Sequence, residues 1–150
     1  MTIGDDKVRR AQTLDAAGAP KEKIIELLED ASREGSPEAR YALGTFYLHG
    51  KYLKKDGVRG VSLIKEAAEA GWRDAIFDLA VAYEVGEFLE KNEEKAFQNY
   101  MKAMILGDLS AAAAVGRCYY YGIGTSENRE VYEDIMDALD EFGEGNTPSQ

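Results

Sequence analysis

The sequence predicts an all-α fold, a right-handed solenoid of stacked antiparallel helix pairs. Two observations predict it: landmark residues recur at one fixed offset of 36 residues, and apolar residues between them are spaced three and four apart. A period of roughly 20 to 50 residues marks supersecondary units that cannot bury their apolar faces without a neighbour. The landmarks in register are Ala39, Ala75 and Ala111; Leu43, Leu79 and Val115; Gly44, Ala80 and Gly116; Tyr47, Tyr83 and Tyr119; Gly50, Gly86 and Gly122; Asp56, Asn92 and Asn128; Ala67, Ala103 and Leu139; and Gly71, Gly107 and Gly143.

The segment 36–50 predicts the first helix of a repeat. Its apolar and small residues, among them Ala39 and Leu43, form a helical stripe. Ser36 can cap this helix and Pro37 suits its first turn. Gly50 falls where the helix should end, because glycine readily adopts the left-handed conformation common at such ends.

A loop and a second helix complete each repeat. Asp56, Asn92 and Asn128 are each placed to accept hydrogen bonds from the free amides of that helix. A glycine is expected to end each of these helices, at 71, 107 and 143. The apolar stripes are Val61, Ile64, Ala67 and Ala68; Ala96, Tyr100, Ala103 and Met104; and Val131, Ile135, Leu139 and Phe142.

Two sets of positions in the register are expected to serve packing. The small residues Gly44, Ala80 and Gly116 let two paired helices approach closely. The tyrosines three positions later, at 47, 83 and 119, would fill the wider space beside them. We therefore expect these tyrosines in the core rather than in a binding site.

The register also predicts how the chain is divided. Lys21 to Arg33 matches the second helix of a repeat, but no complete first helix precedes it in the register. A helix from about Asp5 to Ala17 is expected to cover it. We predict a single structural domain. Its parts are a degenerate N-terminal helix pair acting as a cap (1–35), three repeats spanning 36–143 (36–71, 72–107 and 108–143), and a disordered tail (144–150).

The charge of the chain bears on its partners. With 28 acidic against 18 basic side chains the net charge is −10, which argues against nucleic acid and favours a protein with a basic surface. Much of the charge lies between Glu127 and Glu144, where Arg129 is the only basic residue. That stretch is either the solvated outer face of a capping helix or an acidic docking surface.

The sequence carries no sign of export or membrane insertion. Met1 to Arg10 holds no apolar run of the length that a signal peptide needs, and no later stretch approaches a membrane span. Cys118 is the only cysteine, so an internal disulfide is impossible. We expect a cytoplasmic protein.

The complete pattern resembles the Sel1-like repeat, a relative of the tetratricopeptide repeat with a slightly longer unit. Its alanine, leucine–glycine pair, tyrosine, turn glycine and alanine–alanine-x-x-glycine ending match the first repeat. The usual second turn glycine survives only as Gly124, with Tyr52 and Phe88 in its place earlier. The resemblance implies a scaffold for protein contacts. The matching residues are Ala39, Leu43, Gly44, Tyr47, Gly50, Ala67, Ala68 and Gly71.

Candidates for catalysis are few. His49 and Cys118 fall in the first and third repeats, and stacked helices about 10 Å apart would separate them by roughly 20 Å, too far for a thiolate–imidazole pair. One histidine and one cysteine cannot make a structural zinc site. Gly122-Ile123-Gly124 follows no strand and lacks a third glycine, so it is a turn rather than a nucleotide fingerprint. We expect no cofactor, no metal and no enzymatic activity.

In tetratricopeptide-like arrays the first helix of each repeat lines the concave face, and the resemblance implies the same here. The residues one turn from the core stripe are rich in aromatic and aliphatic groups, as interfaces are. Alternatively, Phe77 or Leu48 packs into a neighbouring repeat. The predicted partner-binding residues are Tyr41, Thr45, Leu48, His49, Phe77, Val81, Glu84, Val85, Arg117, Tyr120 and Tyr121.

Three functions remain open at this point. The first is a non-catalytic module that binds a protein or peptide on this face, in a more specific version an inhibitor or immunity-type protein for a basic toxin or effector. The second is an adaptor in signalling or assembly. The third, of a different class, is an enzyme with an unrecognised carboxylate site.

Overall fold

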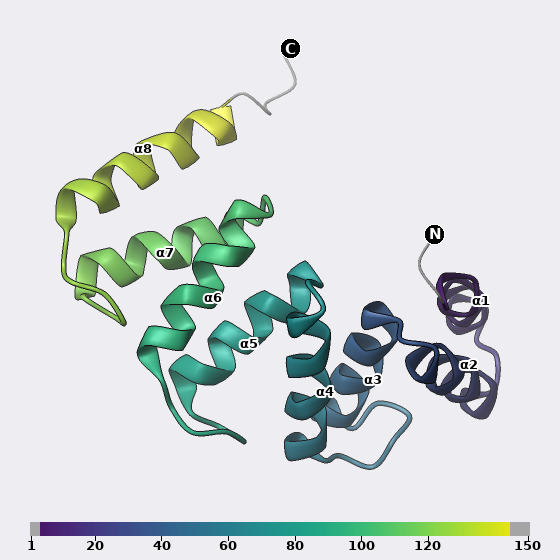
Figure 1. The fold of residues 1–150 in the computed structure, drawn as a ribbon. Helices are drawn as coiled ribbons and strands as arrows, with labels where there is room; N and C mark the ends of the chain where they lie inside the picture. Colours follow the sequence, from purple (N-terminus) through teal and green to yellow (C-terminus); the bar gives the residue numbers. More distant parts are fainter. Residues whose placement is uncertain (1–3, 145–150) are drawn as a thin grey trace. The chain divides into compact units, whose positions relative to one another are not determined.

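The computed structural model describes residues 4–144, and all regular secondary structure in that range is helical (Figure 1). The all-α fold class is therefore confirmed. The predicted tail, 144–150, lies outside the described residues except for the backbone of Glu144. The helices are α1 (Asp5–Ala16), α2 (Lys21–Arg33), α3 (Pro37–His49), α4 (Gly57–Glu69), α5 (Arg73–Val85), α6 (Glu93–Ile105), α7 (Leu109–Tyr121) and α8 (Arg129–Glu144).

The chain forms two compact units, the N-terminal unit (Met1–Leu79) and the C-terminal unit (Ala80–Gln150), with the boundary inside α5. In the N-terminal unit α1 packs on α2, α2 on α3, and α3 on α4, while α1 also contacts α3. In the C-terminal unit α7 packs against both α6 and α8. Packing between consecutive helices is the solenoid pattern that the register predicts.

The helix starts follow the predicted caps. Five helices are preceded by a Ser, Asp or Asn whose side-chain oxygen accepts a hydrogen bond from the backbone N–H three residues later. Asp108, which was not predicted as a cap, does the same as the four predicted residues. The capping residues are Ser36, Asp56, Asn92, Asp108 and Asn128.

The helix ends follow the predicted glycines with one exception. Gly50, Gly86 and Gly122 have positive φ angles of 69°, 76° and 70°, as expected for glycines that end helices. The prediction for Gly143 is wrong, because α8 continues through it to Glu144. A helical glycine costs only about 1 kcal/mol, which the hydrogen bonds of the surrounding turn can offset.

Close approach of paired helices is confirmed at two of the small residues. A methyl group on Gly44 would lie 2.9 Å from the carbonyl oxygen of Gly60 in α4, and one on Gly116 would lie 2.6 Å from the Met136 methyl group in α8. The tyrosines behave less uniformly than predicted. Tyr83 is buried, whereas Tyr47 and Tyr119 are half-buried.

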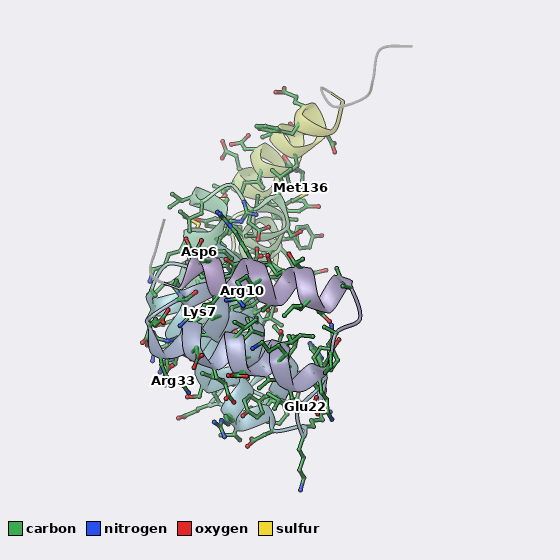
Figure 2. All side chains as sticks on the ribbon, turned by 90° about the vertical axis from the view of Figure 1, so that its right-hand side faces the viewer. Asp6, Lys7, Arg10, Glu22, Arg33 and Met136 are labelled. Carbon is green, nitrogen blue, oxygen red and sulfur yellow. The ribbon has the colours of Figure 1, made fainter. Side chains whose placement is uncertain are left out.

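Helices α1 and α2 pack against each other as a pair. The buried cores of α1 and α2 join that of α3 in one cluster. The outer surface of the pair is charged, and Figure 2 shows Asp6 and Arg10 on α1 and Glu22 and Arg33 on α2, all exposed. The cluster consists of Val8, Ala11, Ile24, Leu27, Leu28, Ala31, Ala39 and Leu43.

Candidate functional site

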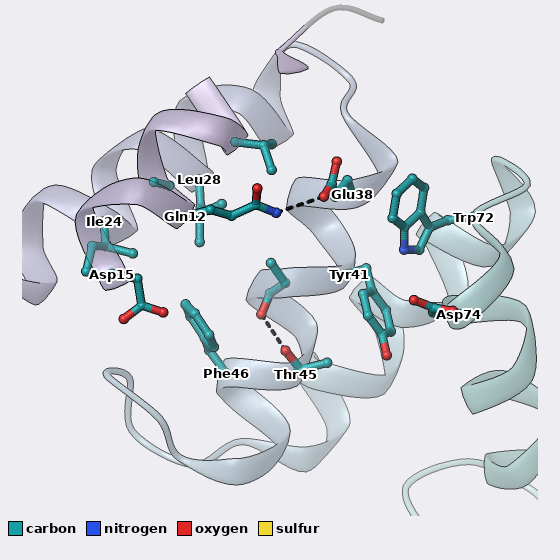
Figure 3. Close-up of a pocket in the computed structure, with 13 residues that line it drawn as sticks. Gln12, Asp15, Ile24, Leu28, Glu38, Tyr41, Thr45, Phe46, Trp72 and Asp74 are labelled. Atoms are coloured by element: carbon teal, nitrogen blue, oxygen red, sulfur yellow. Dashed lines mark hydrogen bonds between the residues drawn. The ribbon is translucent and has the colours of Figure 1, made fainter. Parts of the chain in front are cut away.

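A groove of about 280 Å³ opens in the N-terminal unit between α1, α3 and the start of α5; we call it the N-terminal groove (Figure 3). Its floor is apolar, since Val8, Ile24 and Leu28 line it and are each no more than 3% exposed. They belong to the core that holds α1 and α2 against α3. The groove is therefore built on a packed base rather than on a loop.

The walls of the N-terminal groove carry three carboxylates, Asp15, Glu38 and Asp74, and no basic side chain. Glu38 accepts a hydrogen bond of 3.0 Å from the Gln12 amide, the partner drawn in Figure 3. This partner is neutral, and the described residues place no cation within ion-pair distance of Glu38. The negative charge of Glu38 is thus uncompensated.

The other two carboxylates meet cations only at the margin of the groove. Asp15 accepts a hydrogen bond from the Tyr52 hydroxyl, and Lys51 Nζ lies 3.5 Å away. The Tyr52 hydrogen bond, aided by Lys51, lowers the pKa of Asp15. Among the described residues, the one cation within ion-pair distance of Asp74 is Arg73, at 3.8 Å, and both side chains are about half-exposed. Such an exposed pair at long distance neutralises little.

Tyr41 and Trp72 form an aromatic wall of the same groove. The Tyr41 hydroxyl donates a hydrogen bond of 2.8 Å to Asp78, and burial together with that bond raises the pKa of Tyr41 far above its usual range. The indole nitrogen of Trp72 is buried and has no hydrogen-bond partner among the described residues. A buried donor without a partner is uncommon in folded proteins.

Of the residues predicted in this unit, the structure brings Tyr41 and Thr45 into the groove but not the other three. Leu48 lies at the α3–α4 contact, because a methyl group added to Gly60 would come within 2.9 Å of its backbone nitrogen. His49 is exposed at the end of α3, and Phe77 is half-buried. The groove residues that the sequence analysis missed include Gln12, Asp15, Glu38, Trp72 and Asp74.

A signal for two of the missed residues was present in the register. Glu38 and Asp74 are 36 residues apart, so they occupy the same position in successive repeats. They lie one helical turn before Tyr41 and Phe77. Acidic residues at equivalent positions of two first helices indicate a shared surface.

In the C-terminal unit the predicted charged residues bind each other. Arg117 in α7 donates two hydrogen bonds to Glu84 in α5, of 2.6 and 2.8 Å, and the Tyr100 hydroxyl donates a third of 2.7 Å. The Arg117 hydrogen bonds are the main cause that lowers the pKa of Glu84. A bidentate guanidinium–carboxylate pair is strong and geometrically specific. Glu84 is therefore already neutralised within the unit.

Three of the other predicted residues in this unit, Val81, Val85 and Tyr121, are exposed, and Tyr120 is half-buried. The exposed fraction is 38% for Val81, 62% for Val85 and 67% for Tyr121. Tyr120 lies against the rings of Tyr121 and Tyr132, with ring centroids 4.8 and 4.9 Å away. We call the set Val81, Glu84, Val85, Arg117, Tyr120 and Tyr121 the C-terminal face.

The sequence profile of the Sel1 repeat matches residues 37–72, 73–108 and 109–131. The chain belongs to the Sel1 repeat family. Sel1 repeat proteins mediate protein–protein interactions and are typically non-catalytic scaffolds. A comparison with curated proteins found no match.

Solved structures share the Sel1 fold. The chain is similar to c5321, a protective antigen of uropathogenic Escherichia coli (TM-score 0.86, 20% identity, 93% of this chain and 31% of that one). It is also similar to a Sel1 repeat protein from Oxalobacter formigenes (TM-score 0.85, 23% identity, 93% of this chain and 58% of that one). A third similar structure is Helicobacter pylori cysteine rich protein B (TM-score 0.62, 28% identity, 65% of this chain and 74% of that one). The chain spans less than two thirds of the length of the first two.

The chain departs from the Sel1 pattern at two turns, where another residue replaces the usual second glycine. Tyr52 and Phe88, which stand at the usual second turn glycine, both adopt positive φ angles, of 61° and 66°, as Gly124 does at 67°. The backbone of the Sel1 turn is thus kept although the glycine is lost. Tyr52 uses its position to contact Phe46 and Asp15, whereas Phe88 is 40% exposed.

The described residues offer no metal site and no membrane span. Among residues 4–144 no three His, Cys, Asp or Glu side chains lie close enough together to hold a metal ion. Burial raises the pKa of Cys118 to about 11, so this thiol stays protonated at neutral pH. None of the helices described combines the length and apolar character needed to cross a bilayer.

Proposed function

We propose that this chain is a non-catalytic interaction module that binds a protein or peptide on the first helices of its Sel1 repeats, chiefly in the N-terminal groove. The observation that carries the proposal is the groove itself, a concave site with an apolar floor and a few polar groups in its walls. The exposed aliphatic and tyrosine side chains of the C-terminal face support a second contact.

The charge supports a partner with a basic surface. The chain has a net charge of −10, and the groove walls hold three carboxylates and no cation. Complementary charge speeds association and rejects partners of the wrong sign. A specific form of the proposal is an inhibitor or immunity-type protein that neutralises a basic toxin or effector in the cytoplasm. The alternative form is a signalling or assembly adaptor.

Site-specific photo-crosslinking in the native cell tests the proposal. A photoreactive residue is placed at Thr45 in the groove and at Val85 and Tyr121 on the C-terminal face, with exposed Ser62 of α4 as the control. We expect one partner protein to be cross-linked from the first three positions and not from Ser62. Cross-links from Ser62 alone, or none from any position, would contradict the proposal.

The inhibitor form has its own test. If it is right, deleting the gene leaves a neighbouring toxic gene product lethal, and re-expression of the chain restores growth. Harmless deletion, with the cross-linked partner proving non-toxic when expressed alone, would favour the adaptor instead. The division into cap, three repeats and tail likewise stays a prediction, which limited proteolysis at the expected boundaries would check.

A further inference from the structure

The N-terminal groove combines features that point to one kind of occupant. Its floor is apolar and its walls are acidic, so it offers burial to an aliphatic stem and negative charge to a cationic head. Lysine and arginine side chains have both parts. Because the one side-chain partner of Glu38 within residues 4–144 is a neutral amide, a cation binding Glu38 would not first have to displace another.

Trp72 gives a second, independent indication. It stands 36 residues from both Ser36 and Asp108, which cap α3 and α7 through side-chain oxygens. An indole has no oxygen, so α5 gives up a cap that is typically worth about 1 kcal/mol. The ring instead lines the groove and leaves its buried N–H without a partner among the described residues. Local rules of this kind are most often broken at functional sites.

The geometry favours arginine over lysine. Glu38 and Asp74 belong to different helices, α3 and α5, and both line the groove, as does Tyr41. A planar guanidinium carries five donors in a fixed fork and stacks on aromatic rings, whereas an ammonium is a compact and strongly hydrated point charge. Two carboxylates beside an aromatic wall match the first better than the second.

We infer that the N-terminal groove binds an arginine side chain of the protein partner, with Glu38 and Asp74 accepting hydrogen bonds from the guanidinium and Tyr41 and Trp72 forming the aromatic wall. This rests on the proposed function, because the arginine belongs to the partner bound there.

Trp72 makes the inference testable without a label, since it is the only tryptophan of the chain. Its emission is followed while the full chain is titrated with a blocked alanine–glycine peptide that contains one arginine. Matched peptides carry lysine or citrulline, the neutral isostere of arginine, at that position. We expect a saturable change with the arginine peptide and at least about tenfold weaker binding of the citrulline peptide, because charge-assisted bonds are lost.

Variants assign the effect to the groove. Glu38→Gln and Asp74→Asn should each weaken binding of the arginine peptide about tenfold, while Glu69→Gln, an exposed change on α4, leaves it unaltered. Far-UV circular dichroism checks that all three variants keep their helices. Equal binding of the arginine and citrulline peptides, no response at all, or unaltered binding by both groove variants would overturn the inference. Lysine binding as tightly as arginine would overturn the choice of arginine.

The two proposals fail in different ways. Cross-linking of a partner from Val85 or Tyr121, combined with a flat peptide titration, would remove the arginine inference and leave the interaction function standing. Absence of any cross-linked partner would remove the proposed function itself.

Discussion

The two units use acidic residues on their first helices in opposite ways. In the C-terminal unit Glu84 is held by Arg117 and Tyr100, which satisfies it within the unit. In the N-terminal unit Glu38 faces the groove with only the Gln12 amide. Thr45, two periods before Arg117 in the register, is too short and uncharged to neutralise it. A guanidinium bound to Glu84, and none bound to Glu38, thus separate a neutralised carboxylate from an open one.

The largest expected effect is on the stability of the two units, at the close helix contacts made by Gly44 and Gly116. Gly44→Ala should destabilise the N-terminal unit by about 2 kcal/mol, because the new methyl group meets the backbone of Gly60 and Ile64, which cannot move easily. Gly116→Ala should change the stability of the C-terminal unit by less than about 1 kcal/mol. There the nearest atom is the flexible end of Met136, and alanine favours the helix.

Each unit contains a natural probe of its own unfolding. Trp72 emission in urea follows the N-terminal unit, and labelling of the buried Cys118 thiol follows the C-terminal unit. If Gly116→Ala proved as damaging as Gly44→Ala, the two contacts would be equally rigid and this part of the comparison would be wrong.

The next effect concerns the neutralised carboxylate and its pH dependence. Arg117→Ala should cost about 1 kcal/mol at neutral pH, a modest value because the Arg117 side chain is 41% exposed. The pKa of Glu84 is lowered in the folded state, so its contribution is present above its ordinary value near 4.5 and is lost as the pH falls through the lowered pKa. The difference between wild type and variant in the free energy of urea unfolding should therefore shrink as the pH is lowered through and below the lowered pKa of Glu84.

Glu84→Gln serves as the control for that titration. It keeps the shape of the side chain but removes the charge, so its stability should vary less between neutral and acid pH than that of the wild type. A gap between wild type and Arg117→Ala that is constant with pH would show that Arg117 acts by packing alone.

The smallest effect tests the aromatic wall. Tyr41→Phe removes the hydroxyl that donates to Asp78 and should lower the free energy of unfolding by about 0.5 kcal/mol, because Asp78 keeps another interaction. The arginine peptide should still bind, since the ring remains. Loss of peptide binding in this variant, with Trp72 emission in the free protein unchanged, would assign the hydroxyl a direct role instead.

Most of the fold was predictable from the sequence because its causes are local. Caps such as Asp56 and glycines such as Gly50 act within one turn of the chain, and the register repeats them. Gly143 was the exception, since a glycine permits a helix end without requiring one.

The candidate site was less predictable because its causes are not local. Glu84 and Arg117 are 33 residues apart, and nothing in their spacing shows that they bind each other. The groove depends on how α1, outside the full register, lies against α3, so Gln12 and Asp15 could not be placed. Trp72 stands where the register has Ser36 and Asp108, but only the structure shows that its ring lines the groove.

The central claim is tested most directly by introducing into the groove an arginine like the one that neutralises Glu84 in the C-terminal unit, and measuring peptide binding. Thr45→Arg places a guanidinium at the register position of Arg117, within the groove that Asp15 and Glu38 line. Followed by Trp72 emission, this variant should bind the arginine peptide at least about tenfold more weakly than the wild type, while the neutral Thr45→Gln retains most of its binding. Binding of the arginine peptide by Thr45→Arg as tight as that of the wild type would contradict the claim that the N-terminal groove is an open acidic site.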